Sequence, residues 1–317
     1  MTSLEVEHLS KSFTVRDKGR RRELRAVDDV SFTLRSGETV ALVGESGSGK
    51  STIARMLARL TKPSAGRILL DGKPPGRSRD YRGQVQMVFQ DPFSSLNPAH
   101  SIGYHLRRPL LLHGRARRGQ AAIGAEDLLR RVNLTPPEQV ARRYPYELSG
   151  GQRQRVAIAR ALAPGPRILL ADEPVSMLDV SIRLEILNLI DELKREEDLA
   201  VLYVTHDLAT ARYFATSIMV MYRGQIVESG PSDDVILRPA HPYTQLLAAA
   251  APDPETPRPP RSPREAVNLR SDAGTPAGGC LFRPRCPYAM PQCEQEVPTY
   301  TVNETHRARC LLLAGDA

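Results

Sequence analysis

The sequence lacks any long apolar run. No stretch approaches the roughly 18–20 consecutive apolar residues that span a bilayer. The first seven residues also lack the basic and then apolar pattern of a secretory signal, so we expect the protein to stay in the cytosol. Hydrophobic residues (41%) and charged residues (25%) occur as in an ordinary globular protein of 317 residues, which excludes a collagen, a coiled coil and a wholly disordered chain.

Cysteine is absent until residue 280, and all four cysteines then lie in the last 38 residues. In a reducing cytosol, this clustering favours metal chemistry over disulfides. The spacings of five, six and sixteen residues differ from the C-x2-C pair of zinc ribbons and bacterial ferredoxins. Four thiolates can still hold a [4Fe–4S] cluster or Zn²⁺, with free or occasionally oxidised thiols as the alternative. The candidate ligands are Cys280, Cys286, Cys293 and Cys310.

A bound metal would supply the folding energy that a small segment with few apolar residues cannot obtain from its own core. His306, four residues before the last cysteine, is a candidate to replace one thiolate. Such a histidine is more often a surface residue or a hydrogen-bond partner of a ligand.

Basic residues outnumber acidic residues by 44 to 36, which gives a net charge of +8 and a pI near 9.5. This balance suits a nucleic acid, an anionic membrane surface or a phosphate-bearing ligand, and selects none of them. Six basic residues fall within Arg16–Arg25. We interpret that segment as a solvated loop in preference to a dedicated nucleic-acid patch.

The order of segments predicts an α/β fold with helices on both faces of a parallel sheet. Residues 39–43, 86–89, 168–171 and 200–204 are short apolar runs of the buried-strand type, and amphipathic segments separate them. The segment from about 91 to 160 has a helical pattern without a clear buried strand, so we expect an inserted helical lobe. Six prolines between Pro252 and Pro263 predict an extended linker before the cysteine-bearing tail.

A phosphate-binding loop is predicted at Gly44–Ser51, which fits G-x-x-x-x-G-K-[ST] between a predicted strand and a predicted helix. Glycines let the backbone curl so that successive N–H groups point at phosphate oxygens. Lys50 would reach the β- and γ-phosphates, and Ser51 would bind Mg²⁺. The sequence therefore predicts a nucleoside triphosphate site.

The apolar segment 168–171 ends in two carboxylates. Asp172 would lie beside the phosphate loop and hold Mg²⁺, and Glu173 would polarise the attacking water. Residues Leu148–Gln152 open a further predicted helix, whose N-terminus is a ready anion site. Taken alone, this segment is better explained by a simple N-cap at Ser149 with glycines that permit the turn.

Together these motifs resemble the ATP-binding cassette (ABC) family. The resemblance rests on the phosphate loop, Gln90, a signature loop at 148–152, Asp172-Glu173, a D-loop at 176–179 and His206, which follow one another in the family's order. It implies an ABC nucleotide-binding domain over residues 1–250: an α/β P-loop NTPase fold with a RecA-like core, an N-terminal antiparallel β-subdomain and a helical subdomain at about 91–160. Residues 251–317 would be a linker and a C-terminal extension that contains the four cysteines.

In this family two cassettes pack head to tail, and the resemblance implies a role for each motif. Glu173 and His206 would be catalytic, and Asp179 would bridge the two chains. Mg²⁺ would be held through Ser51, Gln90 and Asp172. ATP would contact an aromatic residue for adenine, the phosphate loop and its neighbours: Phe13, Gly44, Glu45, Ser46, Gly47, Ser48, Gly49, Lys50, Ser51, Thr52 and Gln90. The partner's ATP would contact Ser149, Gly150, Gly151 and Gln152. Phe13 is equally a candidate for the core.

A narrower resemblance, to the second ("F-type") ATPase of dipeptide and oligopeptide importers, rests on segments 89–98, 144–149, 174–181 and 241–244 and on the cysteine spacing. It implies a peripheral protein on the cytoplasmic face of the membrane. Its partners would be a second ATPase in a heterodimer, two permease subunits and an extracytoplasmic binding protein. Short peptides are the expected substrate, although nickel and some sugar importers are built alike.

Met177 stands where the family usually has alanine, which bears on interface packing and does not imply inactivity. A soluble cassette ATPase acting on nucleic acid is the rival interpretation, although such proteins usually carry two cassettes or a long insertion. A regulatory subunit without turnover is disfavoured by Glu173 and His206.

Overall fold

The computed structural model describes residues 2–17, 20–250 and 278–314, so the predicted linker at Pro252–Pro263 lies outside the described residues. The chain divides into two compact units, each built from three stretches of sequence. Unit 1 comprises Met1–Lys11, Asp29–Val40 and Ser51–Val204, and unit 2 comprises Ser12–Asp28, Ala41–Lys50 and Thr205–Ala317.

Unit 1 contains the buried strands that the apolar runs predicted. The first two residues of strand β3 (Thr39–Val43) belong to unit 1. Across the sheet, the strands next to β3 are, in order, β7 (Ala200–Thr205), β6 (Ile168–Asp172) and β5 (Val85–Val88). β5, β6 and β7 are parallel, with Ile168 paired to Ala200. Every residue of β6 and β7 is buried, as expected for parallel strands covered on both faces, and every residue of β3 is buried too.

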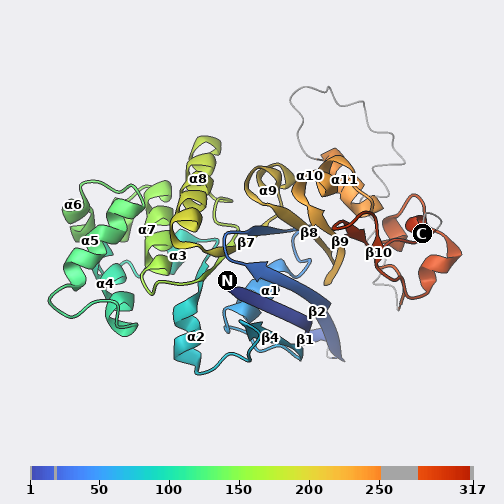
Figure 1. Ribbon diagram of the computed structural model, residues 1–317, viewed down its shortest axis with the longest axis horizontal. Coiled ribbons are helices and arrows are strands. Elements are labelled where there is room, and N and C mark those ends of the chain that lie inside the picture. Colours follow the sequence, from blue (N-terminus) through green and yellow to red (C-terminus); the bar gives the residue numbers. More distant parts are fainter. Residues whose placement is uncertain (1, 18–19, 251–277, 315–317) are drawn as a thin grey trace. The chain divides into compact units, whose positions relative to one another are not determined.

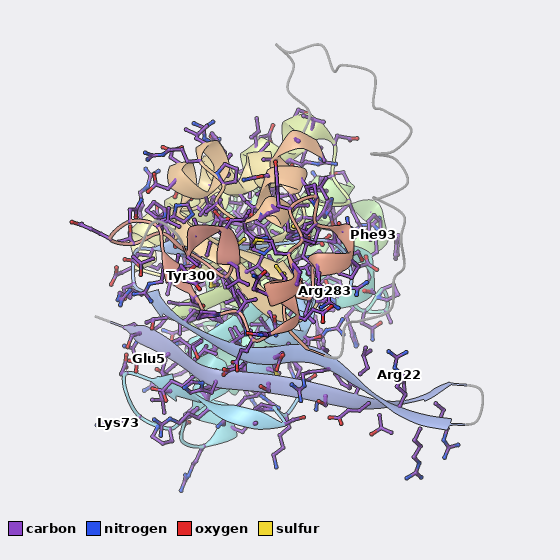
Figure 2. The ribbon with its side chains drawn as sticks, turned by 90° about the vertical axis from the view of Figure 1, so that its right-hand side faces the viewer. Glu5, Arg22, Lys73, Phe93, Arg283 and Tyr300 are labelled. Carbon is purple, nitrogen blue, oxygen red and sulfur yellow. The ribbon has the colours of Figure 1, made fainter. Side chains whose placement is uncertain are left out.

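A second sheet has three strands in the order β2-β1-β4, with bounds Arg20–Arg35, Ser3–Asp17 and Ala65–Leu70. β1 and β4 are antiparallel, and the pairing of Leu4 with Leu70 sets their register. The basic segment that we expected to be a loop instead lies mostly in the ends of β1 and β2, where Arg22 is near the end of the hairpin and exposed (Figure 2).

The region between β5 and β6 is helical, in the green part of the chain in Figure 1. Helix α4 (Ile102–Leu112) shows why. It buries Ile102, Leu106 and Leu110 at four-residue spacing, and Ser101 caps it by accepting the N–H of Tyr104 at 3.4 Å. The other helices of this region are α3 (Pro92–Ser95), α5 (Ala121–Arg131), α6 (Pro137–Arg142), the 3-10 turn η1 (Pro145–Glu147) and α7 (Gly150–Leu162).

Three more helices follow strands or loops of unit 1. They are α1 (Lys50–Leu57), α2 (Ser78–Gln84) and α8 (Val180–Glu197). The first residue of α1, Lys50, is the last residue of a unit 2 segment, and the rest of α1 belongs to unit 1. α8 ends at Asp198, which adopts the left-handed conformation usual for a helix C-terminus (φ 52°).

Unit 2 contains the strands β8 (Ser217–Tyr222) and β9 (Gln225–Pro231), which form an antiparallel pair, and the end of β3. The strand order is β10-β11-β9-β8-β3, and the C-terminal extension contributes β10 (Tyr300–Thr301) and β11 (Arg307–Ala308). The remaining helices and 3-10 turns are α9 (Leu208–Phe214), α10 (Ser232–Leu237), α11 (Pro242–Ala250), η2 (Arg283–Arg285), η3 (Pro291–Glu294) and η4 (Leu311–Leu313).

The extension shares an apolar core with the rest of unit 2. Phe282, Val297 and Ala308 are at most 2% exposed, and β11 pairs with β9 through Ala308 and Glu228. This docking provides a source of folding energy that the sequence did not suggest. Across all the residues described, no helix combines the length and the apolar character needed to cross a membrane.

Candidate nucleotide site

The phosphate loop lies in unit 2 as far as Lys50, and its backbone admits only glycine at two positions. Gly49 has φ of +110°, and a Cβ there would lie 2.2 Å from the carbonyl oxygen of Ala26. A Cβ on Gly44 would lie 2.2 Å from the carbonyl oxygen of Met221 on β8. The loop therefore curls tightly against its neighbours, as a phosphate-binding loop must. Ser46 and Gly47 are exposed at its tip.

Two buried polar side chains belong to this loop. Lys50 is 4% exposed, and its Nζ donates to the carbonyl oxygens of Gly44 at 2.7 Å and Glu45 at 2.9 Å. Ser48 is also 4% exposed, and no hydrogen-bond partner for its Oγ exists among the residues described. An ammonium group, an unsatisfied hydroxyl and a helix start form a site suited to an anion.

The predicted Mg²⁺ ligands meet in unit 1. Ser51 Oγ, in the first turn of α1, donates to Asp172 Oδ1 at 2.9 Å, and Asp172 is only 4% exposed at the end of β6. A hydroxyl and a buried carboxylate are oxygen donors of the kind that Mg²⁺ prefers. Thr52, next in the helix, is half-buried.

Glu173 and Gln90 also lie together in unit 1. Gln90 Nε2 donates to Glu173 Oε2 at 3.1 Å, and the Glu173 N–H donates to the carbonyl of Val204 at 2.9 Å. Glu173 has φ of +46°, a conformation that residues other than glycine rarely adopt. Strained backbone of this kind concentrates at functional sites, where the surrounding structure holds it in place.

The signature segment begins α7 in the way that the local interpretation anticipated. Ser149 Oγ accepts the Gln152 N–H at 3.3 Å, and Gln152 Oε1 accepts the Ser149 N–H at 3.1 Å, which makes a capping box. Gly151 faces α8, because a Cβ there would lie 2.9 Å from Ile182, and Gly150 lies near Leu178. Ser149 is exposed, so the cap and the proposed contact with a partner's ATP are compatible.

Three predicted residues remain, for which the family resemblance implied contacts with adenine, the catalytic site and the partner chain. Phe13, in unit 2, is 38% exposed, which excludes the core alternative for its ring. His206, also in unit 2, is exposed directly after β7. Asp179 takes the N-cap position of α8 without a capping hydrogen bond from its side chain.

Two residues that hold the phosphate loop were not predicted from the sequence. Arg285 of the extension forms two 2.9 Å hydrogen bonds with the carboxylate of Glu45, and the hydroxyl of Tyr243 accepts the Glu45 N–H at 2.9 Å. Both lie about 200 residues or more from Glu45 in sequence. Tyr243 falls within the family segment 241–244, but nothing in that segment indicated a contact with the phosphate loop, and no motif marked Arg285.

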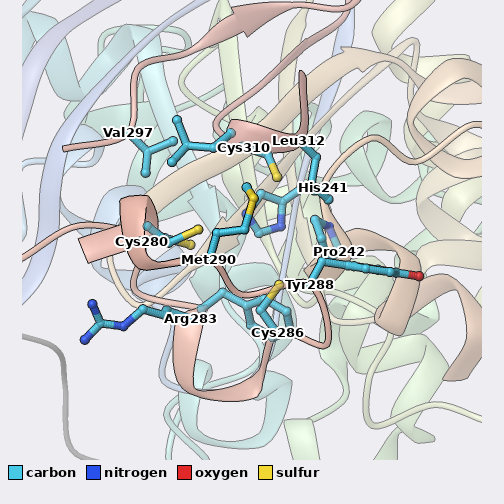
Figure 3. A pocket seen from close by; sticks show the side chains of 13 residues that line it. His241, Pro242, Cys280, Arg283, Cys286, Tyr288, Met290, Val297, Cys310 and Leu312 are labelled. Carbon is cyan, nitrogen blue, oxygen red and sulfur yellow. The ribbon is translucent and has the colours of Figure 1, made fainter. Parts of the chain in front are cut away.

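The four cysteines line one pocket of unit 2 (Figure 3), and among the described residues each is a free thiol. His241, Phe282 and Met290 are among its other lining residues. Burial raises the pKa of Cys280 and Cys286, and it raises the pKa of Cys310 to about 11. Half-buried thiols fit a soft metal centre in chemical kind. However, the residues that the structure describes contain no preformed group of three or more His, Cys, Asp or Glu side chains that could hold a metal ion.

His306 does not belong to the cysteine pocket. It is 1% exposed, and its Nε2 lies 2.7 Å from Glu228 Oε1 on β9. It is therefore neither a surface residue nor one of the residues that line the pocket with the thiols. Its contact joins the extension to the rest of unit 2.

Two family models match the sequence. The model described as "ABC transporter" matches residues 27–176, and the model described as "Oligopeptide/dipeptide transporter, C-terminal region" matches residues 227–293. The first covers the phosphate loop, the signature loop and the two carboxylates Asp172 and Glu173 at the end of β6. The second covers the first three cysteines.

Relatives match over nearly the whole chain. The probable peptide ABC transporter ATP-binding protein y4tS of Sinorhizobium fredii is 45% identical, over 93% of this chain and 85% of its own. The oligopeptide transport ATP-binding protein AppF of Bacillus subtilis is 40% identical, over 94% and 93%. The di/tripeptide transport ATP-binding protein DppF of Pseudomonas aeruginosa is 40% identical, over 91% and 90%.

Solved structures show the same fold. The ATP-binding cassette MJ0796, a dimer in a post-hydrolysis state bound to ADP and Pi, superposes with a TM-score of 0.64 at 30% identity, over 72% of this chain and 98% of its own. The α/β fold with its antiparallel sheet is thus that of a P-loop ATPase cassette, as predicted. The chain belongs to the ABC transporter family, among its ATP-binding proteins, and hydrolyses ATP to drive transport.

Proposed function

We propose that this chain is the ATP-hydrolysing subunit of an importer of short peptides, bound peripherally to the cytoplasmic face of the membrane. The observation that carries the proposal is the combination of an intact cassette with the oligopeptide/dipeptide transporter C-terminal region in one chain. Relatives named for peptide, oligopeptide and di/tripeptide transport support it. Nickel and sugars are the alternative substrates.

The residues of the phosphate loop would bind ATP in this account. The loop's backbone N–H groups and Ser48 would donate to phosphate oxygens, and Lys50 would exchange its carbonyl partners for the β- and γ-phosphates. Ser51, Asp172 and Gln90 would hold Mg²⁺, which supplies charge neutralisation at the phosphates. The exposed ring of Phe13 would stack on adenine.

Glu173 would orient and polarise the attacking water. The hydrogen bond from Gln90 Nε2 and the backbone bond to Val204 hold its carboxylate in place. Gln90 precedes α3 and the helical region, so it would link the chemistry to the helices at about 91–160. We propose that these helices contact a permease subunit. His206 would contact the γ-phosphate.

A second, homologous ATPase would complete each site. The exposed Ser149 with Gly150, Gly151 and Gln152 would contact the partner's ATP. The side chain of Asp179, which makes no capping hydrogen bond to α8, would bridge the two chains. Two permease subunits would carry the substrate, delivered by an extracytoplasmic binding protein. We expect no nucleic-acid partner.

We further propose that Cys280, Cys286, Cys293 and Cys310 hold a [4Fe–4S] cluster, with Zn²⁺ and free thiols as the alternatives. The support is the common pocket that the four half-buried side chains line, because four thiolates in one place can bind a soft metal. The proposed role is structural, in ordering the extension.

Uptake measurements in cells that lack this chain test the function. Wild-type protein should restore uptake of a labelled tripeptide, and Lys50→Ala should not, while uptake of nickel and of a labelled sugar stays unchanged. If nickel or sugar uptake follows the chain instead, the peptide assignment fails. If none of the three follows it, the importer assignment fails.

A further inference from the structure

Glu45, the second residue of the phosphate loop, is held at three points within unit 2. Its carboxylate receives two hydrogen bonds from the guanidinium of Arg285, both at 2.9 Å. Its N–H donates to the hydroxyl of Tyr243 at 2.9 Å, and its carbonyl accepts from Lys50 Nζ at 2.9 Å. The backbone of the loop at this position therefore depends on side chains outside the loop.

The pairing of Glu45 with Arg285 is the paired, bidentate kind that fixes geometry as well as charge. The side chain of Arg285 is only 12% exposed, whereas that of Glu45 is 42% exposed. Hydrogen bonds to the Glu45 carboxylate and to the side chain of Tyr222 raise the pKa of Arg285, so the guanidinium stays charged. A partly exposed carboxylate beside a phosphate site would repel the nucleotide, and this arginine neutralises it.

The guanidinium of Arg285 packs against buried aromatic rings. Its Cζ lies 5.6 Å from the ring centroid of Phe282 and 5.8 Å from that of Tyr222. The rings of Phe282, Tyr222 and Tyr243 pack on one another with centroids 4.6–5.5 Å apart, and all three are at most 2% exposed. An arginine packed against these rings loses little further freedom when it binds Glu45.

The same short turn carries Arg285 and a cysteine of the pocket. Arg285 ends η2, and the N–H of the next residue, Cys286, bonds to the carbonyl of Arg283 at 3.2 Å. Cys280 starts the turn, because its carbonyl accepts the N–H of Arg283. The turn that presents two of the four thiols is thus the turn that presents the arginine.

We propose that Arg285 is a positioning residue for ATP binding: it neutralises and orients Glu45, so that the C-terminal extension completes the phosphate loop. The inference rests on the proposed role of residues 44–51 as the ATP site. Loss of the arginine leaves the Glu45 carboxylate unpaired next to the polyphosphate. Removal of that carboxylate as well should then restore affinity, although the contact between extension and loop stays broken.

Equilibrium binding of Mg-ATP to the full chain separates positioning from mere docking. Arg285→Ala should weaken ATP binding about tenfold, the scale of one charge-assisted hydrogen bond. The double variant Arg285→Ala with Glu45→Gln should return to within about twofold of wild type. Arg307→Ala, which removes an exposed arginine from the same extension, is the matched control and should bind as wild type.

Arg285→Lys is a milder variant that controls for a folding defect. It retains the positive charge but cannot form the two parallel hydrogen bonds of a guanidinium, so its affinity for ATP should be intermediate. Wild-type affinity for Arg285→Ala contradicts the proposal. So does a double variant that binds no better than Arg285→Ala alone, because that result assigns the contact to docking only. Lys50→Ala in the same assay tests the site itself: normal binding there overturns the ATP-site assignment, whatever the arginine does.

Discussion

His306 of the extension and Glu228 of β9 form a buried pair, with Nε2 and Oε1 2.7 Å apart and side chains 1% and 0% exposed. Glu228 also accepts the N–H groups of Ala240 and His241, at 2.8 and 2.9 Å. One carboxylate thus joins three segments of unit 2. A buried carboxylate that loses a partner is costly, so this pair is where we expect the extension to be most sensitive.

Substitution of His306 by alanine should destabilise unit 2 by about 3 kcal/mol, because Glu228 loses its buried side-chain partner. Chemical denaturation measures the free energy of unfolding, and limited proteolysis reports release of the extension. Arg212→Ala is the control, since it breaks an exposed pair with Asp233 and should change little. If both variants lose the same free energy of unfolding, the buried His306–Glu228 pair stabilises the protein no more than an exposed pair does.

Stability should also fall in acid through His241. Burial lowers the pKa of this residue to about 4 from its usual 6.5, and its Nδ1 accepts the Tyr243 N–H at 3.0 Å. Between these values the unfolded chain binds the proton and the folded chain does not. This contribution is therefore fully present above pH 6.5 and is lost progressively as the pH falls towards 4, with a limiting slope of about 1.4 kcal/mol per pH unit.

Denaturation at pH 7.5 and pH 5 compares wild type with His241→Asn, which retains a cap acceptor and removes the titrating group. The variant should lose part of the acid sensitivity. An unchanged difference between the two pH values would assign the effect to other groups.

Lys50→Ala should weaken ATP binding about tenfold to a hundredfold, since it removes a charge-assisted contact with the phosphates. Titration calorimetry of the full chain with Mg-ATP gives the affinity. Lys73→Ala removes an exposed lysine of unit 1 and should bind as wild type. A Lys50→Ala chain with wild-type affinity would remove this lysine from the site.

Anaerobic purification tests the cysteine pocket. The account predicts iron, acid-labile sulfide and visible absorbance in wild-type protein, all lost when Cys286 and Cys293 are both changed to serine. Zinc without sulfide would assign the second alternative. Protein with neither metal, and with four thiols that react once unfolded, would assign free cysteines.

Local sequence predicted the structural features of the candidate phosphate site, because they depend on residues at fixed spacing. The curled loop at Gly44–Ser51 and the carboxylates after β6 are of this kind, and so is the N-terminus of α7. The buried parallel strands were predictable because strands covered on both faces are continuous apolar runs. β8 and β9 were not predicted, although β8 is almost wholly buried.

Contacts that join distant segments left no such signal. The bond from Arg285 to Glu45 spans 240 residues, and that from His306 to Glu228 spans 78. In both cases the role of a charged or polar residue depends on a partner that is distant in sequence and is brought close only by folding. For the same reason the sequence placed His306 among surface or pocket residues, and the basic segment Arg16–Arg25 in a loop.

Glu173→Gln tests the central claim most directly. In the purified membrane complex, the variant should bind Mg-ATP as wild type but hydrolyse it at least about a hundredfold more slowly, because the amide cannot polarise the attacking water. Glu185→Gln, which changes an exposed carboxylate of the same unit, should hydrolyse normally. A trapped ATP-bound dimer and loss of peptide uptake would agree with the account, and normal turnover by Glu173→Gln would contradict it.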